Sequence, residues 1–504
     1  MKYRYNSDDL SLKERICRIN GVSPEKLDTS GFHPDQEMEV LKSFRQKLLS
    51  YRDKRFFIVG DYDCDGICAT VIMKRLLDWL QIANNYYIPS RSKDGYGIND
   101  RIVSTAIENG FEVILCVDNG ITAGQQLKVA RDAGLVVLIL DHHEYSDSPE
   151  ADAYLHPDLF PETYSDMCAG GLCALVANGF RDDVLSTIYG GLATLADMVS
   201  VFGYNRYLMK EMLHLLHEKE ILPLNYLAGS KDIDYDVLSY QVIPKINAVS
   251  RMDEKMNVNY VVRYLLENNS DCMVYLNRIE EINKSRKELS RQMFSLAERI
   301  MDPNEKVIAV CSEAFKEGLC GLIANRIMYE FQKPALVFSK NGRELKGSGR
   351  SPTGSDLYSY LKNVEDLFLT FGGHEQAVGL SLDEEKLPVL LDYISKNDLQ
   401  IEEQIRDVVL LEQEEIDFAL LDQLEELKPF GPDFSEPLFG IKDPVIVKTY
   451  SSAGRFKKYS LNEILEAIDF RNKKEKDTFS RMIGKVKRDD YHKNKVSFVI
   501  EETV

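Results

Sequence analysis

Between residues 56 and 140, short apolar segments alternate with amphipathic ones, and this alternation is the strongest constraint on the fold. The apolar segments are about five residues long and rich in Val, Ile, Leu and Phe, as at 56–60, 113–117 and 136–140. Longer segments with apolar residues at helical spacing lie between them, such as 67–80. Strands buried on both faces and joined by helices are typical of parallel sheets. The sequence therefore predicts an α/β fold with a doubly wound parallel sheet.

A chain of 504 residues is too long for a single core, since domains usually span about 100–200 residues. An amphipathic pattern at 283–301 predicts a long connecting helix. Apolar and glycine-flanked segments after it predict a second α/β domain, and β-like segments near the end predict a small β-barrel. The expected regions are an N-terminal helical extension at 1–50, the doubly wound domain at 51–220, a helical region with the connecting helix at 221–301, the smaller α/β domain at 302–400 and the barrel at 401–504.

Charge is distributed unevenly along the chain. Lys and Arg total 62 against 81 Asp and Glu, a net charge of −19, which argues against a protein coated with nucleic acid over its whole surface. Residues 380–440 hold 17 acidic and 4 basic residues, whereas residues 441–504 hold 10 acidic and 15 basic residues. We interpret this as an acidic hinge followed by a basic module, and a local basic groove stays compatible with it.

The sequence indicates neither a membrane segment nor a disulfide framework. No apolar run approaches the roughly 18 residues of a bilayer span, and the N-terminus has no apolar signal core, so we expect a cytoplasmic protein without membrane attachment. The nine cysteines include no C-x-x-C pair, and Cys168 and Cys173, the nearest candidates for a metal pair, have no second Cys or His pair beside them. The oligomeric state leaves no signal in the sequence.

Three carboxylates follow the first predicted strand at alternate positions, Asp61, Asp63 and Asp65. Carboxylates this crowded repel one another unless a cation lies among them. The pattern D-x-D-x-D-G also opens an EF-hand loop, but position 12 of that loop would be Ile72 instead of glutamate, and a strand precedes it instead of a helix. A different kind of cation site is therefore expected.

The later strands of the predicted sheet also end in polar groups. Asp118 directly follows one apolar segment, and Asp141-His142-His143 follows the next. Because the carboxyl ends of parallel strands share one crevice, these groups should meet there. A further acid, Asp197, stands among small and apolar residues, where an unpaired carboxylate would be costly. The expected cluster consists of Asp63, Asp65, Asp118, His142 and Asp197.

This combination of ligands indicates the metal and the reaction. Carboxylates with an imidazole suit Mn²⁺ or Mg²⁺ better than a metal selected by thiolates. Two such ions about 3.5–4 Å apart are the usual device for hydrolysing a phosphodiester bond. We therefore expect two divalent cations, Mn²⁺ or Mg²⁺, and phosphodiester hydrolysis.

Four motifs, GDYDCDG, CVDNG, DHHE and LADMV, stand in an order that resembles the signature of the DHH phosphoesterase superfamily. Later segments, IPKINAVSR, KGSGRSPTGSDLY, FGGHEQAVGLSL and LKPFGPDFSEPLF, resemble the bacterial RecJ family. The resemblance runs from about residue 56 to the C-terminus. It implies a metal-dependent 5′ to 3′ exonuclease of single-stranded DNA, acting in DNA repair or recombination. The implied parts are a DHH catalytic domain at 51–220, a DHH-associated domain at 302–400 and an OB-like barrel at 401–504.

The resemblance also assigns roles to single residues. The metal ligands fall on the cluster already named, and Asp61 would lie just outside it or beside the second ion. His143 would face the scissile phosphate, with Arg91 as a second contact. The family's usual arginine is Lys245 here, so a point charge would replace a fork-shaped contact. Phosphates near the 5′ end would meet Asn247, Arg251, Ser348, Arg350 and the loop Gly372-Gly373-His374.

The C-terminal region alternates charges with aromatic rings, which suits a single strand held by its backbone and its bases. The residues concerned are Tyr450, Arg455, Phe456, Lys457, Lys458 and Tyr459. A solvated face of the barrel accounts for the same pattern equally well. Single-stranded DNA is the expected partner, while a single-stranded-DNA-binding protein or a helicase is left open.

Three functions compete at this point. The first is the exonuclease just described. The second is a phosphodiesterase of short oligonucleotides or cyclic dinucleotides, an activity of related DHH proteins that generally lack the KINAVSR-like segment and the C-terminal barrel. The third is a non-catalytic nucleic-acid-binding scaffold. Relatives of that kind lose metal ligands, whereas this chain keeps all of those named.

Overall fold

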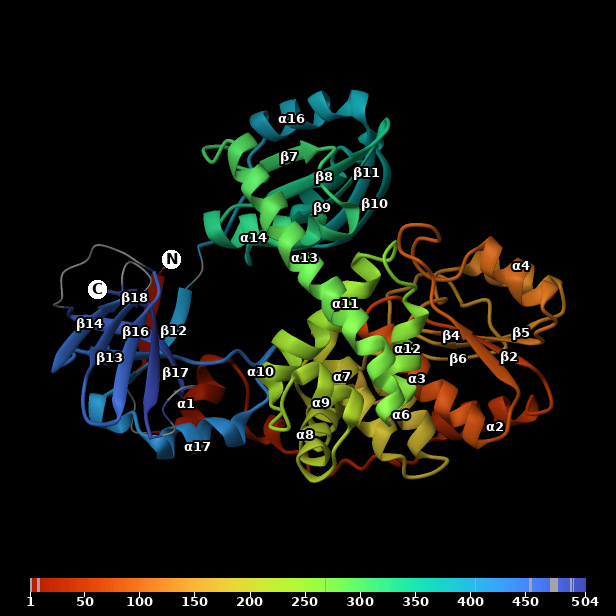
Figure 1. Cartoon of the computed structure of the whole chain (residues 1–504), viewed down its shortest axis with the longest axis horizontal. Helices are drawn as coiled ribbons and strands as arrows, with labels where there is room; N and C mark the ends of the chain where they lie inside the picture. Colours follow the sequence, from red (N-terminus) through yellow and green to blue (C-terminus); the bar gives the residue numbers. More distant parts are fainter. Residues whose placement is uncertain are drawn as a thin grey trace.

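The structure is a computed structural model that describes residues 2–6, 10–267, 269–403, 405–452, 456–471, 479–489, 492 and 494–504. The described strands form three sheets, of five, five and eight strands. Figure 1 shows these sheets in separate lobes, and the long helix α13 (Met273–Ile300) joins two of them. In the part of the chain that the structure describes, no helix is both long and apolar enough to cross a membrane.

The first sheet is the doubly wound sheet that the alternating segments predict. Its strand order is β3-β2-β4-β5-β6, and every pairing is parallel. The chain therefore moves first to one side of β2 and then to the other, which puts the topological switch point between β2 and β4. The strands are β2 (Phe56–Val59), β3 (Asn84–Tyr87), β4 (Val113–Val117), β5 (Val136–Leu140) and β6 (Ala153–Leu155).

Helices cover both faces of this sheet because alternate residues of a strand point to opposite sides. Phe56 and Ile58 join a large apolar core on one face, whereas Phe57 and Val59 join a separate core on the other. Burial on both faces explains why these strands are apolar throughout. The first face carries α2 (Glu39–Ser50), α3 (Cys64–Trp79) and α6 (Ala169–Asn178), and the second carries α4 (Asp100–Glu108) and α5 (Gly124–Asp132).

A helical region leads from this domain to the rest of the molecule. The predicted connecting helix is present as α13, but it begins at Met273 instead of residue 283, because Leu276, Ile279 and Ile282 continue its buried stripe. The other helices are α7 (Val184–Ala196), α8 (Gly203–Glu218), α9 (Leu222–Ala228), α10 (Tyr235–Val237), α11 (Ile243–Arg251) and α12 (Asn259–Leu266).

The second α/β domain contains a mixed sheet of order β10-β11-β9-β8-β7, in which only β7 and β8 pair in parallel. Its strands are β7 (Ile308–Ser312), β8 (Ala335–Asn341), β9 (Glu344–Arg350), β10 (Phe368–His374) and β11 (Ala377–Asp383). Its helices are α14 (Cys320–Phe331), α15 (Leu357–Lys362) and α16 (Leu387–Lys396).

Two glycine-rich segments of this domain are strands. Gly347 lies in β9, where a β-carbon would come within 2.4 Å of the Phe338 ring, so glycine is needed there for close packing. Gly372-Gly373-His374, which we expected as a loop, ends β10 and pairs with β11. The expectation of a loop is wrong because these residues pair with β11, and a β-carbon on Gly373 would come within 2.2 Å of the Ala377 carbonyl oxygen.

The C-terminal domain is one continuous sheet of order β1-β12-β13-β17-β18-β16-β15-β14. In the described residues, no pairing between β14 and the opposite edge closes it into the predicted barrel. Strand β1 (Lys2–Asn6) pairs in parallel with β12 and forms the edge of the sheet opposite β14. The other strands are β12 (Ile405–Leu411), β13 (Leu438–Lys442), β14 (Lys448–Ser452), β15 (Phe456–Ser460), β16 (Leu465–Asp469), β17 (Arg481–Arg488) and β18 (Val496–Thr503).

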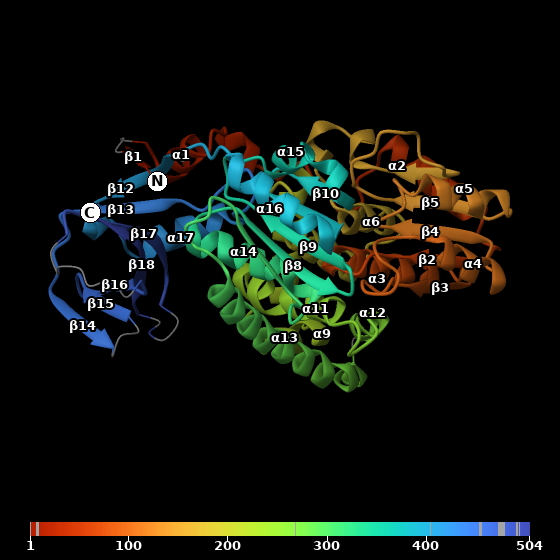
Figure 2. The ribbon, with the colours of Figure 1, turned by 90° about the horizontal axis from the view of Figure 1, so that it is seen from above.

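The N-terminal region differs from the helical extension predicted at 1–50. It begins with strand β1, whose Tyr5 ring lies under the Arg481 guanidinium at 3.8 Å. Helix α1 (Leu12–Ile19) joins the apolar core of the C-terminal domain, whereas α2 joins that of the first domain. Figure 2 shows the C-terminal domain and the sheet of β2 to β6 at opposite ends of the molecule, so α1 and α2 belong to lobes at opposite ends.

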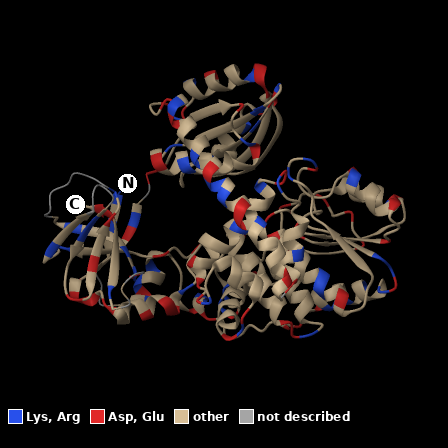
Figure 3. Ribbon diagram, in the orientation of Figure 1, with Lys and Arg blue, Asp and Glu red and all other residues tan. Residues whose placement is uncertain are grey.

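Two expectations about the C-terminal half are wrong. The acidic stretch 380–440 is not a hinge, because it contains α16, β12 and α17 (Phe418–Leu427), each with buried apolar residues. Figure 3 accordingly shows acidic and basic residues spread over all three lobes. In the charged aromatic patch, the Tyr459 side chain is 1% exposed and packs in the domain core, so it cannot stack on a base. Arg455 of that patch lies outside the described residues.

Candidate active site

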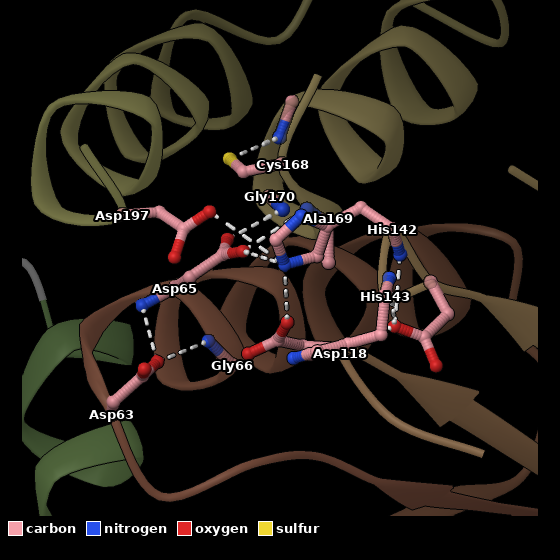
Figure 4. A network of polar contacts seen from close by, with 12 residues as sticks. Asp63, Asp65, Gly66, Asp118, His142, His143, Cys168, Ala169, Gly170 and Asp197 are labelled. Carbon is pink, nitrogen blue, oxygen red and sulfur yellow. Dashed lines mark hydrogen bonds and ion pairs between the residues drawn. The ribbon is translucent and has the colours of Figure 1, made fainter. Parts of the chain in front are cut away.

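The predicted cluster forms at the carboxyl ends of the strands of the first sheet. Asp63 follows β2, Asp118 follows β4 and His142 follows β5, while Asp197 comes from the end of α7. Figure 4 shows Asp65, Asp118, His142 and Asp197 directed toward one another. The cluster therefore lies at the switch point between β2 and β4, the usual ligand position in an open parallel sheet.

Asp63 and Asp65 are held by backbone N–H groups at two helix N-termini. Asp63 caps α3, and its Oδ1 accepts hydrogen bonds from the N–H groups of Asp65 (2.9 Å) and Gly66 (3.2 Å). The Asp65 carboxylate accepts hydrogen bonds from the N–H groups of Ala169 (3.0 Å) and Gly170 (2.7 Å), at the start of α6. The first N–H groups of a helix lack partners within it and attract negative charge. Both acids are thereby fixed in position.

Gly66 permits the close approach of α3 to the end of β2. A β-carbon at this position would lie 2.6 Å from the backbone nitrogen of Asp61 and 2.7 Å from its Cα. Backbone atoms cannot move aside as the end of a side chain can. The last residue of the GDYDCDG motif is therefore glycine for steric reasons.

Asp118 and His142 form the centre of the cluster. The His142 Nε2 atom lies 3.3 Å from an Asp118 oxygen, 3.6 Å from an Asp197 oxygen and 3.8 Å from an Asp65 oxygen. Asp118 adopts a left-handed backbone conformation with φ of +62°, which is uncommon for a residue other than glycine and often marks a functional site. Its N–H donates to the Leu140 C=O at 2.8 Å, which ties the end of β4 to β5.

Three overlapping groups of ligand atoms could each hold a cation. They are Asp61-Asp63-Asp118, Asp65-His142-Asp197 and Asp118-His142-His143. Asp118 and His142 each belong to two groups, as expected where neighbouring ions share ligands. One buried oxygen of Asp61 and one of Asp118 have no hydrogen-bond partner among the described residues, which is costly for a carboxylate unless a cation supplies the contact. The donor set therefore fits divalent cations that prefer oxygen and imidazole ligands.

Burial and neighbouring carboxylates raise the pKa values of these acids in the metal-free protein. They raise the pKa of Asp65 to about 7 and that of Asp197 to about 8. They also hold the pKa values of Asp61 and Asp118 well above the usual aspartate range. Burial lowers the pKa of His142 to about 4, so its imidazole is neutral and able to bind a metal. A cation would replace the protons that the acids otherwise require.

Asp141 orients both histidines and was not among the predicted site residues. Its carboxylate is buried and accepts hydrogen bonds from the His143 ring nitrogen Nδ1 (2.7 Å) and from the His142 N–H (2.8 Å). Burial alone would lower the pKa of His143, but the hydrogen bond and charge of Asp141 outweigh burial and raise that pKa to about 8. The His143 ring is 40% exposed, so a largely cationic imidazole faces the opening of the site near neutral pH.

Tyr96 is a second residue that the motifs alone did not single out. Its hydroxyl lies 3.0 Å from the His143 ring nitrogen Nε2 and 3.2 Å from the backbone C=O of Asp118. The hydroxyl therefore links the exposed imidazole to the end of β4. Its position in the segment RSKDGYG, beside the predicted Arg91, was the available signal.

Four arginines, which we call the arginine wall, lie close together beside the cluster: Arg91, Arg251, Arg286 and Arg350. Burial, followed by the charges of the other three, lowers the pKa of Arg251 to about 10. Arg251 and Arg350 donate to the backbone carbonyls of Gly318 (3.4 Å) and Gly349 (2.7 Å). The Arg286 Nε atom is buried and has no partner in the part of the chain that the structure describes. Guanidinium groups gathered in this way suit phosphate oxygens.

The arginine wall adjoins the carboxylates through Tyr62, because the Arg91 guanidinium lies 5.2 Å from the centre of that ring. Tyr62 stands between Asp61 and Asp63 in the sequence. The positively charged and negatively charged parts of the site are therefore direct neighbours.

Sequence reasoning missed Arg286 because a single arginine in the charged face of α13 looks like an ordinary solvent-facing residue.

The remaining predicted contacts are Ser348, Asn247 and the segment Gly372-Gly373-His374. Ser348 and Arg350 lie on β9, and a β-carbon on Gly321 of α14 would sit 3.1 Å from Arg350 and 3.5 Å from Ser348, so the three residues adjoin. The Asn247 Oδ1 atom is buried without a partner, which leaves it available to a ligand.

The segment Gly372-Gly373-His374 lies two strands across the sheet from Ser348, on β10, and stays a predicted contact. Lys245 does not join the arginine wall. Its Nζ pairs with Glu280 and donates to the Leu227 C=O, both at 2.5 Å, so it holds helices together and the expected point-charge contact is wrong.

Three segments match known domain families, and each coincides with one of the sheets. Residues 55–196 match the DHH family, N-terminal domain, residues 304–397 match the DHHA1 domain and residues 409–502 match the RecJ OB domain. The C-terminal sheet is therefore an OB domain, although its strands do not close into a barrel in the described residues. The first sheet and the carboxylate cluster at its edge therefore belong to a domain of the DHH family.

The chain is 30% identical over 455 residues to the single-stranded-DNA-specific exonuclease RecJ of Dickeya dadantii, which covers 80% of this chain and 77% of that protein. It is 28% identical over 423 residues to RecJ of Bacillus subtilis, covering 79% of this chain but 54% of the relative, so it spans about half of that protein's length. The crystal structure of RecJ from Thermus thermophilus in complex with Mn²⁺ matches with a TM-score of 0.84 at 21% identity, covering 100% of this chain and 79% of that one. The chain belongs to the RecJ family.

Replacement of Gly66 by alanine should disrupt the cluster. We expect Mn²⁺ binding to weaken at least about tenfold and stability to fall by about 1–3 kcal/mol, because the new β-carbon would push Asp61 and α3 apart. Calorimetric titration with Mn²⁺ and thermal unfolding measure the two effects. Gly171→Ala in α6 is the matched control, since its nearest neighbour would be 3.7 Å away. Unchanged Mn²⁺ affinity in Gly66→Ala would contradict the steric argument.

The raised pKa values predict how pH affects the metal-free protein. Asp65 and Asp197 keep protons in the folded state up to about pH 7 and 8, whereas unfolded aspartates lose them near pH 4. The unfolded state therefore binds fewer protons in this window, and the free energy of unfolding should fall as pH rises from about 4 to about 8. The melting temperature in chelator should show this decline.

Added Mn²⁺ should remove most of the decline, because the cation takes the place of the protons. The variant Asp197→Asn, which imitates the protonated acid, should lose less stability than wild type between about pH 5 and pH 8 in chelator. A steeper decline in Asp197→Asn than in wild type would refute the assignment.

Proposed function

We propose that this protein is a metal-dependent exonuclease that hydrolyses the phosphodiester bonds of single-stranded DNA in the 5′ to 3′ direction. The proposal rests on one observation: a group of acidic side chains and a group of basic side chains adjoin in the same site. Buried carboxylates with unpartnered oxygens lie on one side, and the arginine wall lies on the other. Such a site is complementary to cations and phosphates together. The names of the relatives, single-stranded-DNA-specific exonucleases, support the same substrate.

The residues that would hold two divalent cations are Asp63, Asp65, Asp118, His142 and Asp197, with Asp61 beside the second ion. The oxygen and imidazole donors favour Mn²⁺ or Mg²⁺, and Mn²⁺ is the ion in the Thermus thermophilus structure. When bound, such ions supply a water of lowered pKa and offset the negative charge on the phosphoryl oxygens. The neutral His142 is suited to this role because a protonated imidazole has no free lone pair.

Residues of the chain itself would bind and orient the strand. His143, kept largely protonated by Asp141, would contact the scissile phosphate, and the Tyr96 hydroxyl would hold its ring in place. The arginine wall would bind the phosphates nearest the 5′ end, with Ser348 and Asn247 as neutral contacts. The wall adjoins the cluster through Tyr62, so an anchored terminus would present a bond very near the end for cleavage. Mononucleotides are the expected product.

The other two candidate functions are less well supported. A phosphodiesterase of cyclic dinucleotides has no use for an additional OB domain, which matches over residues 409–502 here. A scaffold without activity has no use for a complete set of ligands, and the candidate ligands lie together in this protein. The exonuclease is therefore preferred over both.

The cellular setting forms part of the proposal. An enzyme that degrades single strands would work in DNA repair or recombination, in the cytoplasm where DNA is processed. A helicase that opens duplexes or a single-stranded-DNA-binding protein would be its natural partner, because each one produces or covers the substrate.

Asp118→Ala should abolish nuclease activity while the protein stays folded, since the substitution removes a ligand shared by two cation groups and no core packing. We expect a loss of roughly 10²–10³-fold or more. The assay follows 5′-labelled single-stranded DNA in Mn²⁺ or Mg²⁺, and wild type should release the label as a mononucleotide. Asp132→Ala is the control, because this exposed acid of α5 pairs with Lys128, one turn away on the same helix.

Two results would argue against this mechanism. Activity of Asp118→Ala in the presence of chelator would exclude the metal-dependent route. Equal digestion by wild type of linear DNA and of circles without a 5′ end, or a preference for cyclic dinucleotides, would favour the phosphodiesterase instead.

Arg251→Met should weaken binding to 5′-phosphorylated single strands and reduce the dependence of binding on salt. Each phosphate contact to a single strand contributes about 0.7 to the slope of log K against log salt concentration, so one lost contact lowers the slope by roughly that amount. Binding titrations at several salt concentrations measure it. Arg278→Met is the control, since Arg278 lies on α13 and pairs with Glu281. An unchanged slope in Arg251→Met would show that Arg251 makes no contact with a phosphate of the strand.

A further inference from the structure

One short segment connects a candidate metal ligand to the C-terminal domain. This junction segment, residues 195–206, begins at the end of α7 and runs into α8. Asp197 lies near its start. Unlike Asp65, whose carboxylate is held by two backbone N–H groups, the Asp197 carboxylate accepts no hydrogen bond from the N–H and O–H groups of the described residues, and His142 Nε2 lies 3.6 Å away. The position of this carboxylate therefore depends on the path of its backbone.

The middle of the junction segment is packed against the C-terminal domain. Val201 is buried in the apolar core of that domain, and its N–H donates to the Pro432 C=O at 3.4 Å. The adjacent Phe202 ring lies 5.8 Å from the Phe434 ring, centre to centre. A β-carbon on Gly431 would sit 2.7 Å from the Val201 side chain, so the two surfaces are in close contact.

The residues on either side of Asp197 are held as well. Leu195 contacts both the core of the catalytic domain and the core of the C-terminal domain. Met198 adopts a left-handed conformation with φ of +58°, although the residue is 66% exposed. Such a conformation persists only where the surroundings impose it. The contacts of Leu195 and Val201 provide that constraint, on both sides of the ligand.

Arg206 anchors the junction segment from α8. Its side chain is 1% exposed, and its guanidinium donates to three successive backbone carbonyls, those of Leu427 (2.5 Å), Lys428 (3.1 Å) and Pro429 (3.1 Å). It also lies over the Phe434 ring at 5.6 Å. These three acceptors offset much of the cost of burying the charge, although the Nε atom has no partner among the described residues. The chain after α17 is therefore tied firmly to α8.

We propose that docking of the C-terminal domain on the junction segment positions Asp197, so that the cation site is complete only while that domain is docked. Arg206 is the positioning residue. The inference rests on the proposed metal site. It means that docking of the OB domain raises the affinity of the catalytic domain for cations. Because such coupling is reciprocal, bound cations should also strengthen the docking.

The first test compares Mn²⁺ binding in the full-length wild type and in Arg206→Met. Electron paramagnetic resonance of free Mn²⁺ reports binding without any nuclease reaction. We expect binding to weaken about tenfold, at the lower end of the 10–100-fold effect typical of residues that orient a ligand. Arg206→Lys, which keeps a donor, should recover part of the affinity.

Mn²⁺ should slow proteolysis of the junction segment in wild type, and it should slow it less in Arg206→Met.

Arg15→Met is the matched control for loss of a buried arginine. Arg15 of α1 donates to the backbone carbonyls of Leu410 (2.5 Å) and Asn6 (3.2 Å), outside the junction segment. Its loss should lower stability and leave Mn²⁺ affinity unchanged. An equal loss of affinity in Arg15→Met would overturn the proposal, because general destabilisation would then explain both variants.

A double-mutant cycle identifies the residue through which Arg206 acts. If Arg206 works through Asp197, adding Arg206→Met to Asp197→Asn should cost no further Mn²⁺ affinity. Additive losses, or wild-type affinity in folded Arg206→Met, would overturn the inference. If Arg206→Met does not fold, Phe202→Leu takes its place in the cycle. This substitution loosens the packing of the junction segment against Phe434 of the C-terminal domain. A wild-type protein that binds no Mn²⁺ would refute the proposed function instead.

Discussion

Buried carboxylates that face one another repel, and the catalytic domain is organised around that repulsion. Asp61, Asp65 and Asp118 are nearly inaccessible to solvent, and burial together with neighbouring charge raises their pKa values. The fold offsets part of the cost with backbone N–H groups at the start of α3 and α6. It leaves oxygens of Asp61 and Asp118 without a partner among the described residues, so protons or cations have to offset the rest of the cost.

The groups of the arginine wall also carry like charges that repel one another, but here the charge is positive. Its guanidinium groups are partly buried beside one another, and Arg251 and Arg350 are held by backbone carbonyls. Although acids and arginines adjoin through Tyr62, no ion pair joins the two sets among the described residues. Each set therefore keeps its capacity for a ligand of opposite charge, cations for the acids and phosphates for the arginines. Cations bound by the acids, together with a phosphodiester bound between those cations and the arginines, would neutralise both sets.

Strand periodicity and the strand-end rule predicted most of the catalytic domain and its cluster. Asp63, Asp118 and His142 could be placed because the ends of parallel strands share an edge whatever the details of packing. Other residues could not be placed in this way. Tyr459 looks like a stacking residue but is buried, β1 pairs with a strand some 400 residues later in the chain, and Arg286 differs from other helix-surface arginines only by its neighbours. Each of these depends on contacts between segments distant in the chain.

The amino-acid sequence by itself determined the doubly wound sheet, the chemistry of the donor set and the kind of ion that suits it, because these follow from local periodicity and residue type. Tertiary structure alone decided how the parts are joined. It placed four arginines from separate segments against the acids, let Asp141 fix the charge of His143, and set the C-terminal domain against the residues around Asp197. The reason is physical: charge complementarity and packing across domains are properties of distances in space, which residue order does not specify.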